Sequence, residues 1–375
     1  MEIVFWLSVL IICYSFIGYP FLLRIICIFK RNEPFKEDAY FPTVSIILSV
    51  YNEEKIIEKK IKNFFSLDYP KESLDMVIVS DNSTDNTEGI ISFINSDRIK
   101  LIVQDKRAGK TESLNRGILA SNGDILLFTD ANSMLQKDSV KKLVRHFRDK
   151  NVGLVTGRCV YYRSSDEGEE VISGFYNRYE QVLKKEESKV GTVVGADGAI
   201  YAMRKELYEP LKAVYINDLI HPIQVVLKGY KAILETEAIC REEIDESHSE
   251  ELNRQTRIMA QSFLIYFSQI LKLLSKRKLL YAVELTSHKF MRWFSLPWML
   301  IFFISTIVLC AKGTFYQMVL IPQIVFITLA MMGKYLNAGI LRLPHYFCLV
   351  HLAALLGLYK LISGNIYITW EPRKN

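Results

Sequence analysis

The chain has 375 residues, a formal net charge of +6 and 50% hydrophobic residues. The length allows roughly two domains, and the basic clusters flank apolar stretches, which favours anionic lipid headgroups over nucleic acid as partners. The six cysteines form no CxxC pair and lie mostly in apolar segments, which argues against disulfides and zinc.

An apolar segment opens the chain. Residues 3–29 contain one charge and exceed the roughly 20 residues needed to cross a bilayer. The basic start and small-residue cleavage site of a signal peptide do not accompany them, so we expect an uncleaved anchor. Lys30 and Arg31 follow, and the positive-inside rule then predicts that the residues beyond them are cytoplasmic. We predict a transmembrane helix over 1–30 and a polar linker over 31–42.

Short apolar runs then alternate with runs of helical periodicity. The sequence predicts strands over 43–51, 75–81, 99–105 and 124–130, and helices over 53–67, 86–94 and 110–121. This alternation is typical of a parallel sheet with helices on both faces. We therefore predict a Rossmann-like, mainly parallel α/β domain over 43–250, in which the charged residues 168–188 form a further helix.

The last third of the chain is predicted to contact the membrane. Residues 251–293 alternate basic and apolar residues at helical spacing, which indicates amphipathic helices at the membrane surface. Residues 294–375 contain two stretches long enough to span a bilayer, 294–311 and 314–333, and a marginal one, 345–359. The third stretch decides the side of the C-terminus, and its basic tail favours the inside.

Polar side chains follow three of the four predicted strands. Asn52 and Glu53 follow the first, Asp81 ends the second, and Asp130 ends the fourth. Ligands bind beyond the carboxyl ends of parallel strands. We expect these side chains to meet at one edge of the sheet.

Two of these positions have more than one interpretation. Asp81 could accept a hydrogen bond from a ring N–H such as that of uracil, or it could cap the following helix. Lys110 could neutralise a diphosphate. The surrounding "AGKT" is not a P-loop, because Gln104 stands where that motif needs glycine.

Asp130 is the predicted metal ligand. Mg²⁺ or Mn²⁺ takes one or two carboxylates together with phosphate oxygens and water, so one carboxylate at a strand end can hold the ion when a substrate supplies the rest. The metal would stabilise charge on a departing diphosphate. Asn132 offers a neutral carbonyl oxygen as a second ligand.

Four segments in this order and spacing resemble the family 2 glycosyltransferases with a GT-A fold: "VSIILSVYNEEKIIEKKI", "IVSDNSTDNT", "RAGKTESLNRG" and "LLFTDANS". The resemblance covers roughly residues 43–260 and includes the cellulose, chitin and hyaluronan synthase group. It implies a membrane-bound inverting hexosyltransferase of the cell membrane with a cytoplasmic catalytic domain. The enzyme would move a sugar from a nucleotide-sugar donor, a UDP-sugar, to a glycan or lipid-linked acceptor in cell-envelope or exopolysaccharide synthesis.

The resemblance also implies roles for residues on the donor side. Tyr51, Asn52 and Glu53 match the first nucleotide-contacting motif, Asp81 the base-binding aspartate, and Lys110 the basic residue near the donor. In addition, Asp130 and Asn132 occupy the ends of the DxD metal motif, in which relatives usually have two aspartates. This departure leaves less negative charge for Mg²⁺ or Mn²⁺.

Further matches concern the acceptor and the base. Asp197 matches the acceptor-contacting position, and Asp218 matches the catalytic base, although Asp218 by itself also fits a helix N-cap. A base that takes the proton of an acceptor hydroxyl agrees with direct displacement at the anomeric carbon. His221 lies beside the predicted base and is the histidine of interest, but lone histidines are more often structural.

Residues 254–258 fall where processive relatives have QxxRW. Arg257 keeps the arginine, whereas Arg254 replaces the glutamine and Ile258 the tryptophan, which puts polymerisation in doubt without weakening sugar transfer. Arg254 and Arg257 share a helix face and either contact the diphosphate or form a basic face on lipid headgroups.

Two other functions remain open. One is a lipid glycosyltransferase that acts on a ceramide or a polyprenyl phosphate, and the other is an inactive subunit that keeps the fold inside a membrane complex. The main hypothesis allows other membrane proteins of polysaccharide synthesis as partners.

Overall fold

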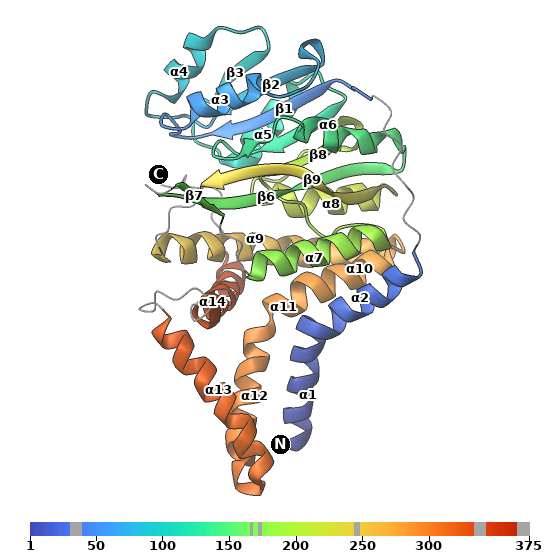
Figure 1. The fold of residues 1–375 in the computed structure, drawn as a ribbon, viewed down its shortest axis with the longest axis vertical. Coiled ribbons are helices and arrows are strands. Elements are labelled where there is room, and N and C mark those ends of the chain that lie inside the picture. The colour runs from blue at the N-terminus through green and yellow to red at the C-terminus, as the bar shows by residue number, and fades with distance from the viewer. Residues whose placement is uncertain (31–39, 166–167, 172–174, 244–247, 334–342, 366–375) are drawn as a thin grey trace. The chain divides into compact units, whose positions relative to one another are not determined.

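The computed structural model describes residues 1–30, 40–165, 168–171, 175–243, 248–333 and 343–365 (Figure 1). Two compact units make up the chain. Among the described residues, the sheet unit lies within Ile26–Glu246 and Leu271–Tyr281, and the helical unit lies within Met1–Ile25, Ser247–Ile270 and Ala282–Ile366. Most of the predicted linker and the basic C-terminal tail lie outside the described residues.

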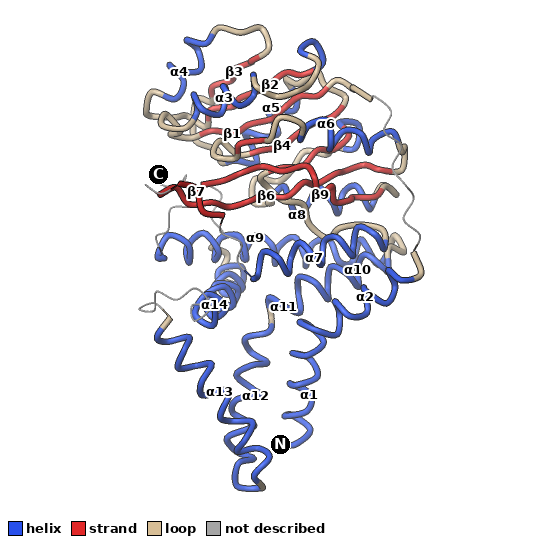
Figure 2. The backbone as a smooth tube through the Cα atoms, in the orientation of Figure 1, coloured by secondary structure: helices blue, strands red, loops and turns tan. Residues whose placement is uncertain are grey.

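The strands of the sheet unit form one sheet, drawn in red in Figure 2. Its order is β3-β2-β1-β4-β8-β6-β9-β5, and β7 pairs with β6. The bounds are β1 Val44–Val50, β2 Leu74–Ser80, β3 Ile99–Val103, β4 Ile125–Thr129, β5 Met134–Leu135, β6 Val152–Ser165, β7 Gly168–Val171, β8 Ile200–Arg204 and β9 Lys231–Glu243.

The first four strands in this order, β3 to β4, are parallel, as the sequence predicts. β8 runs antiparallel to both β4 and β6, and β6 is parallel to β9. The α/β prediction is confirmed. The predicted helix over 168–188 is wrong in its first turn, because residues 168–171 form β7 against β6 and the helix begins only at Phe175.

Helices cover both faces of the sheet, because apolar residues recur at helical spacing on one side of each helix. Side chains of α3, α4 and α6 pack in one core cluster with β1, β2 and β4. Side chains of α5 and α8 pack on the opposite face. The helices of this unit are α3 Ile57–Phe65, α4 Thr87–Ile94, α5 Lys110–Leu119, α6 Ser139–Val144, α7 Phe175–Val190 and α8 Asn217–Leu227.

The remaining helices belong wholly or partly to the helical unit. They are α1 Glu2–Cys13, α2 Tyr19–Ile28, α9 His248–Ser275, α10 Leu279–Leu285, α11 Met291–Trp293, α12 Ser295–Leu309, α13 Thr314–Met332 and α14 Leu343–Ile362. A π-helical turn, Tyr14–Gly18, joins α1 to α2.

Five helices in the described residues are long and apolar enough to cross a membrane: Glu2–Ile28, Glu251–Ser275, Ser295–Lys312, Thr314–Met332 and Leu343–Ile362. The predicted spans near both ends of the chain thus correspond to continuous helices. Glu251–Ser275 also has the length and composition of a span, although the sequence pattern favours a surface helix. Its position at the membrane surface stays a prediction.

Candidate active site

The site begins at three neighbouring strand ends. β1 lies between β2 and β4 with all three strands parallel, so their carboxyl ends open on one edge. Asp81 directly follows β2, and Asp130 directly follows β4. The predicted meeting of polar side chains at one edge agrees with this register.

The segment after β1 makes a tight turn. Asn52 has a φ of 53°, in the left-handed region that asparagine tolerates. Its Oδ1 accepts the N–H of Thr84 at 2.8 Å, and its Nδ2 donates to the hydroxyl of the same residue at 3.2 Å. The N–H of Glu53 donates to the Thr87 hydroxyl at 2.8 Å. Asn52 therefore ties the end of β1 to the turn after β2, and its contact with a nucleotide stays a prediction.

Asp81 is fully buried and bound by protein donors. Its Oδ1 accepts the N–H of Ala108 at 2.7 Å and the side-chain amide of Gln104 at 3.3 Å, and its Oδ2 accepts the N–H of Gly109 at 2.9 Å. The helix-cap interpretation is wrong, because α4 begins at Thr87, with Asn86 in the capping position. Asp81 holds the 104–109 loop, and a base-binding role requires this loop to release it.

Lys110 and Asp130 form an ion pair between Nζ and Oδ1. Lys110 is the first residue of α5 and follows Gly109, whose φ of 91° favours glycine. Nearby, the Arg107 guanidinium stacks on the Tyr51 ring at 3.8 Å from its centroid. Two predicted donor residues, Lys110 and Asp130, are thus in direct contact.

The predicted metal site can be compared with the side chains that the structure offers as metal ligands. Among the described residues no group of three or more His, Cys, Asp or Glu side chains is arranged to hold a metal. Asp130 supplies one carboxylate, and the Lys110 ammonium against it shows that this carboxylate already stabilises a cation. These residues fit a divalent ion that takes its remaining ligands from a diphosphate and water. Asn132 as a ligand stays a prediction.

The net negative charge around Asp130 is smaller than the number of acidic side chains there indicates. Burial, together with the neighbouring Asp130 and Asp85, raises the pKa of Glu53 to about 8, so Glu53 is mostly neutral at pH 7. Burial lowers the pKa of Lys60 to about 8, which leaves it mostly charged. An isolated divalent ion therefore finds little net negative charge here.

The predicted base lies against the strand next to β4. β8 pairs with β4 so that Ile200 lies opposite Thr129, which brings residues 197–199 beside Asp130. A Cβ built on Gly198 would lie 3.1 Å from Asp218 Oδ2. The N–H of Ala196 donates to the Asp218 carbonyl at 2.9 Å. Asp130 and the predicted base Asp218 therefore lie at the adjoining ends of β4 and β8.

Asp218 lies in the first turn of α8, after Ile216 in the capping position, so the N-cap interpretation is wrong. Burial raises the pKa of the Asp218 carboxyl; Lys110 and Lys184 oppose the shift, and Asp130 adds to it. A buried carboxylate with a raised pKa accepts a proton more readily than an exposed one.

Asp197, the predicted acceptor residue, contacts backbone. Its Oδ2 accepts the N–H of Cys159 at 2.9 Å, and its Oδ1 accepts the N–H of Ala199 at 3.3 Å. Its own N–H donates to the Thr156 hydroxyl at 2.7 Å. Asp197 thus joins the loop before β8 to β6, and an acceptor contact stays a prediction.

The family model "Glycosyl transferase family 2" matches residues 45–211, which contain all the predicted strand-end residues and Asp197. Residues 45–211 are thus similar to the family 2 glycosyltransferases. The match confirms the resemblance found in the four sequence motifs.

The curated relatives carry names that refer to different products. This chain is 27% identical over 242 residues to "Probable glycosyltransferase YdaM" of Bacillus subtilis, and the match covers 60% of this chain and 57% of the relative. It is 28% identical over 162 residues to "Beta-monoglucosyldiacylglycerol synthase" of Nostoc, and the match covers 42% of this chain and 35% of the relative. It is 26% identical over 204 residues to "Poly-beta-1,6-N-acetyl-D-glucosamine synthase" of Staphylococcus aureus, with 52% and 49% covered. The chain thus spans about half the length of these relatives, or less.

One solved structure matches nearly the whole chain. It is the mannosyltransferase PcManGT from Pyrobaculum calidifontis in complex with GDP-Man and Mn²⁺. The TM-score is 0.70 at 20% identity, covering 96% of this chain and 99% of that chain. This match confirms the predicted GT-A fold. The five apolar helices of the described residues indicate a membrane protein.

A buried polar network next to the predicted base was not predicted from the sequence. Asn217 Nδ2 donates to the Tyr201 hydroxyl at 2.6 Å, and the same hydroxyl shares a hydrogen bond of 2.9 Å with Nδ1 of His221. Burial lowers the pKa of His221 to about 3, which keeps the ring neutral. The network joins β8 to the start of α8 and thereby helps to position Asp218. His221 was singled out in the sequence, but its partner Tyr201 lies 20 residues away along the chain.

Arg254 and Arg257 lie on α9 and have protein partners. The Arg254 guanidinium pairs with Glu251 at 2.7 and 2.8 Å. Arg257 Nη1 lies 3.4 Å from the Gln261 side-chain oxygen. Contact of either arginine with a diphosphate stays a prediction.

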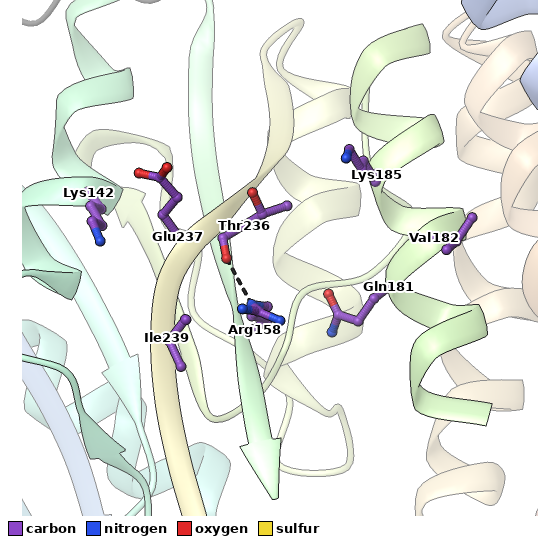
Figure 3. Close-up of a pocket in the computed structure, with 8 residues that line it drawn as sticks. All are labelled: Lys142, Arg158, Gln181, Val182, Lys185, Thr236, Glu237 and Ile239. Atoms are coloured by element: carbon purple, nitrogen blue, oxygen red, sulfur yellow. Dashed lines mark hydrogen bonds between the residues drawn. The ribbon is translucent and has the colours of Figure 1, made fainter. Parts of the chain in front are cut away.

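A pocket of about 550 Å³ lies within the sheet unit, outside the set of predicted site residues (Figure 3). In it the Arg158 Nε donates to the Thr236 carbonyl at 2.8 Å. It is lined by Lys142, Arg158, Gln181, Val182, Lys185, Thr236, Glu237 and Ile239.

The register between β6 and β9 shifts beside this pocket. There Glu235 Oε2 accepts from Arg145 Nη2 and lies against His146 Nε2, each at 2.6 Å. Despite burial, these hydrogen bonds and the N–H of Glu237 lower the Glu235 pKa to about 2. This cluster stabilises an irregular stretch of the sheet.

Proposed function

We propose that the protein is a membrane-bound, inverting glycosyltransferase that moves a sugar from a nucleotide-sugar, a UDP-sugar, to a hydroxyl of a glycan or lipid-linked acceptor. One observation carries this proposal. Asp130, paired with Lys110, and Asp218, packed against Gly198, come together at the ends of the paired strands β4 and β8.

The donor side would bind the nucleotide diphosphate. Lys110 is available to exchange its ion pair with Asp130 for one with a phosphate group, and this exchange frees the Asp130 carboxylate. A bound Mg²⁺ or Mn²⁺ would stabilise the negative charge that develops on the leaving diphosphate. Tyr51, Glu53 and Asp81 would then surround the nucleoside. The solved mannosyltransferase, which is in complex with GDP-Man and Mn²⁺, supports the pairing of a nucleotide-sugar with a divalent metal.

The acceptor side would use Asp218 as the catalytic base. Its carboxylate takes the proton of the attacking hydroxyl, the acceptor oxygen forms a bond to the anomeric carbon, and the bond from this carbon to the diphosphate breaks. Attack from the face opposite the leaving group inverts the anomeric configuration. The raised pKa of Asp218 supports its role as a proton acceptor.

The acceptor class rests on the relatives and on the membrane helices. One matched relative is named a poly-beta-1,6-N-acetyl-D-glucosamine synthase and another a beta-monoglucosyldiacylglycerol synthase, so both a glycan and a lipid acceptor have support. Apolar helices in the chain would hold the catalytic domain at the membrane, with the domain on the cytoplasmic side. A lipid acceptor is the second candidate, and Ile258 in the place of the tryptophan of processive relatives favours single transfer.

The proposal is tested with purified protein, a panel of nucleotide-sugars, and glycan and lipid acceptors. Asp130→Ala and Asp218→Ala should each reduce transfer by at least about a hundredfold. Asp68→Ala is the matched control, because this exposed aspartate pairs with Lys141 and is not one of the predicted site residues. Loss of activity only in the two site variants supports the proposal. If the wild-type protein bound no nucleotide and hydrolysed no donor, the inactive-subunit hypothesis would replace it.

A further inference from the structure

Lys60 has a buried ammonium group on a helix whose other lysines face solvent. Its residue surface is 1% exposed, whereas the side chain of Lys62 is 74% exposed. Burying an ammonium group costs several kcal/mol unless hydrogen bonds and opposite charges compensate. Such a residue is therefore expected to have specific partners.

The two hydrogen-bond partners of Lys60 lie at the two ends of one turn. Its Nζ donates to the hydroxyl of Thr129 at 2.9 Å and to the carbonyl oxygen of Ser133. Thr129 is the last residue of β4, and Ser133 follows directly after the predicted metal ligands Asp130 and Asn132. One ammonium group therefore closes the turn that carries both of these side chains.

Other contacts fix the same segment. One helical turn beyond Lys60, Asn63 pairs with the backbone of Leu135, accepting its N–H and donating to its carbonyl, both at 2.8 Å. From the other side, the Ser133 hydroxyl donates to Glu242 on β9. The turn is thus held by α3 and by β9.

The charges around Lys60 agree with this role. Asp130 and Glu242 both act on the ammonium as favourable negative charges. Glu242 is 5% exposed, so each buried charge partly compensates the other. Replacing Lys60 by an apolar residue removes the cation and both hydrogen bonds while leaving Glu242 buried.

We propose that Lys60 is a positioning residue, which holds the 129–133 turn so that Asp130 and Asn132 face the metal and diphosphate. The proposal rests on the proposed function, because it assigns Lys60 a part in donor binding. Residues that support metal ligands typically change metal affinity by 10- to 100-fold when they are replaced. The effect of Lys60 should therefore appear in metal affinity as well as in turnover.

The test compares Lys60→Met with Lys62→Met, an exposed lysine on the same helix that pairs only with Glu58 among the salt bridges of the described residues. Binding of Mn²⁺ in the presence of UDP is measured by the loss of the free Mn²⁺ signal in electron paramagnetic resonance. Lys60→Met should weaken this binding about tenfold or more. Lys62→Met should equal the wild type.

Hydrogen exchange of the 129–135 amides provides a readout that needs no ligand. Lys60→Met should speed this exchange about tenfold, since a charge-assisted hydrogen bond to the turn is lost. Unchanged exchange and unchanged Mn²⁺ affinity would overturn the inference. If the wild-type protein itself bound no Mn²⁺ with UDP, the proposed function would fail, and the exchange data would still decide whether Lys60 holds the turn.

If Lys60→Met does not fold, Thr129→Val gives the same comparison, because it removes one acceptor of Lys60 and keeps nearly the same volume. It should shift Mn²⁺ affinity in the same direction by about threefold or more. An affinity equal to that of the wild type would also count against the inference.

Discussion

Replacing Asp218 with asparagine separates the proposed base from the shape of its site. Asparagine keeps the size of aspartate. Size matters here because the Asp218 side chain lies close to Gly198: a Cβ added to Gly198 would be only 3.1 Å from Asp218 Oδ2. The substitution removes the proton acceptor and leaves the contacts of Lys110 and Asp130 in place. Donor binding should therefore survive while transfer is lost.

The size of the effect follows from the role of a general base. Such groups contribute typically 10² to 10⁴ in rate, which is about 3 to 5 kcal/mol of activation free energy. The turnover number for a hydroxyl acceptor should fall by this factor, and the affinity for UDP, measured by calorimetry, should change less than about threefold. A turnover number within about tenfold of the wild type would refute the assignment of Asp218 as the base. Full activity confined to a polyprenyl phosphate, which is already ionised, would favour the lipid-phosphate alternative.

The same variant has a predictable effect on stability. Because burial raises the pKa of Asp218, the folded state binds this proton more tightly than the unfolded state does. Its contribution to stability is present at low pH and is lost as the pH rises through the raised pKa. Asp218→Asn should therefore melt at a higher temperature than the wild type at pH 8, and the difference should shrink towards pH 4. A lower melting temperature at pH 8 would contradict the desolvation of Asp218.

Three further outcomes are expected. Gly198→Ala should lower the turnover number about tenfold or more at unchanged UDP affinity, since the added Cβ displaces Asp218; unchanged turnover would show that Asp218 tolerates the shift. The pKa of Glu235, which is paired with Arg145, is lowered from 4.5 to about 2, so its ionised form should contribute about 3 kcal/mol of stability above pH 5, and this contribution is lost as the pH falls towards 2. Glu235→Gln should therefore lower the melting temperature above pH 5 and have less effect near pH 2. Equal melting temperatures of variant and wild type above pH 5 would contradict this. Asn132→Asp should lower the metal concentration that gives half-maximal activity, and an unchanged or raised value would show that Asn132 is not a ligand.

The sequence was sufficient to predict the strand-end residues. The predicted strands are apolar runs that end on polar side chains, and parallel pairing brings neighbouring carboxyl ends together whatever the details of packing. Asp81 and Asp130 therefore come directly after β2 and β4, as predicted. Their exact partners depend on loops, so the burial of Asp81 under the 104–109 loop was not foreseen.

The residues that support the site were harder to predict. Lys60 lies in a helix with many lysines, and its burial depends on two residues about 70 positions further along the chain. The Tyr201, Asn217 and His221 network joins a strand to a later helix, and no local pattern encodes such a contact. The strand at 168–171 was mistaken for helix because its charged sequence has no alternation of apolar and polar residues.

The anomeric configuration of the product tests the central claim most directly. Wild-type protein is incubated with the nucleotide-sugar that it turns over and a hydroxyl acceptor, and the new linkage is assigned by proton NMR. Direct displacement with Asp218 as the base predicts a configuration opposite to that of the donor. A product with the configuration of the donor would contradict the account.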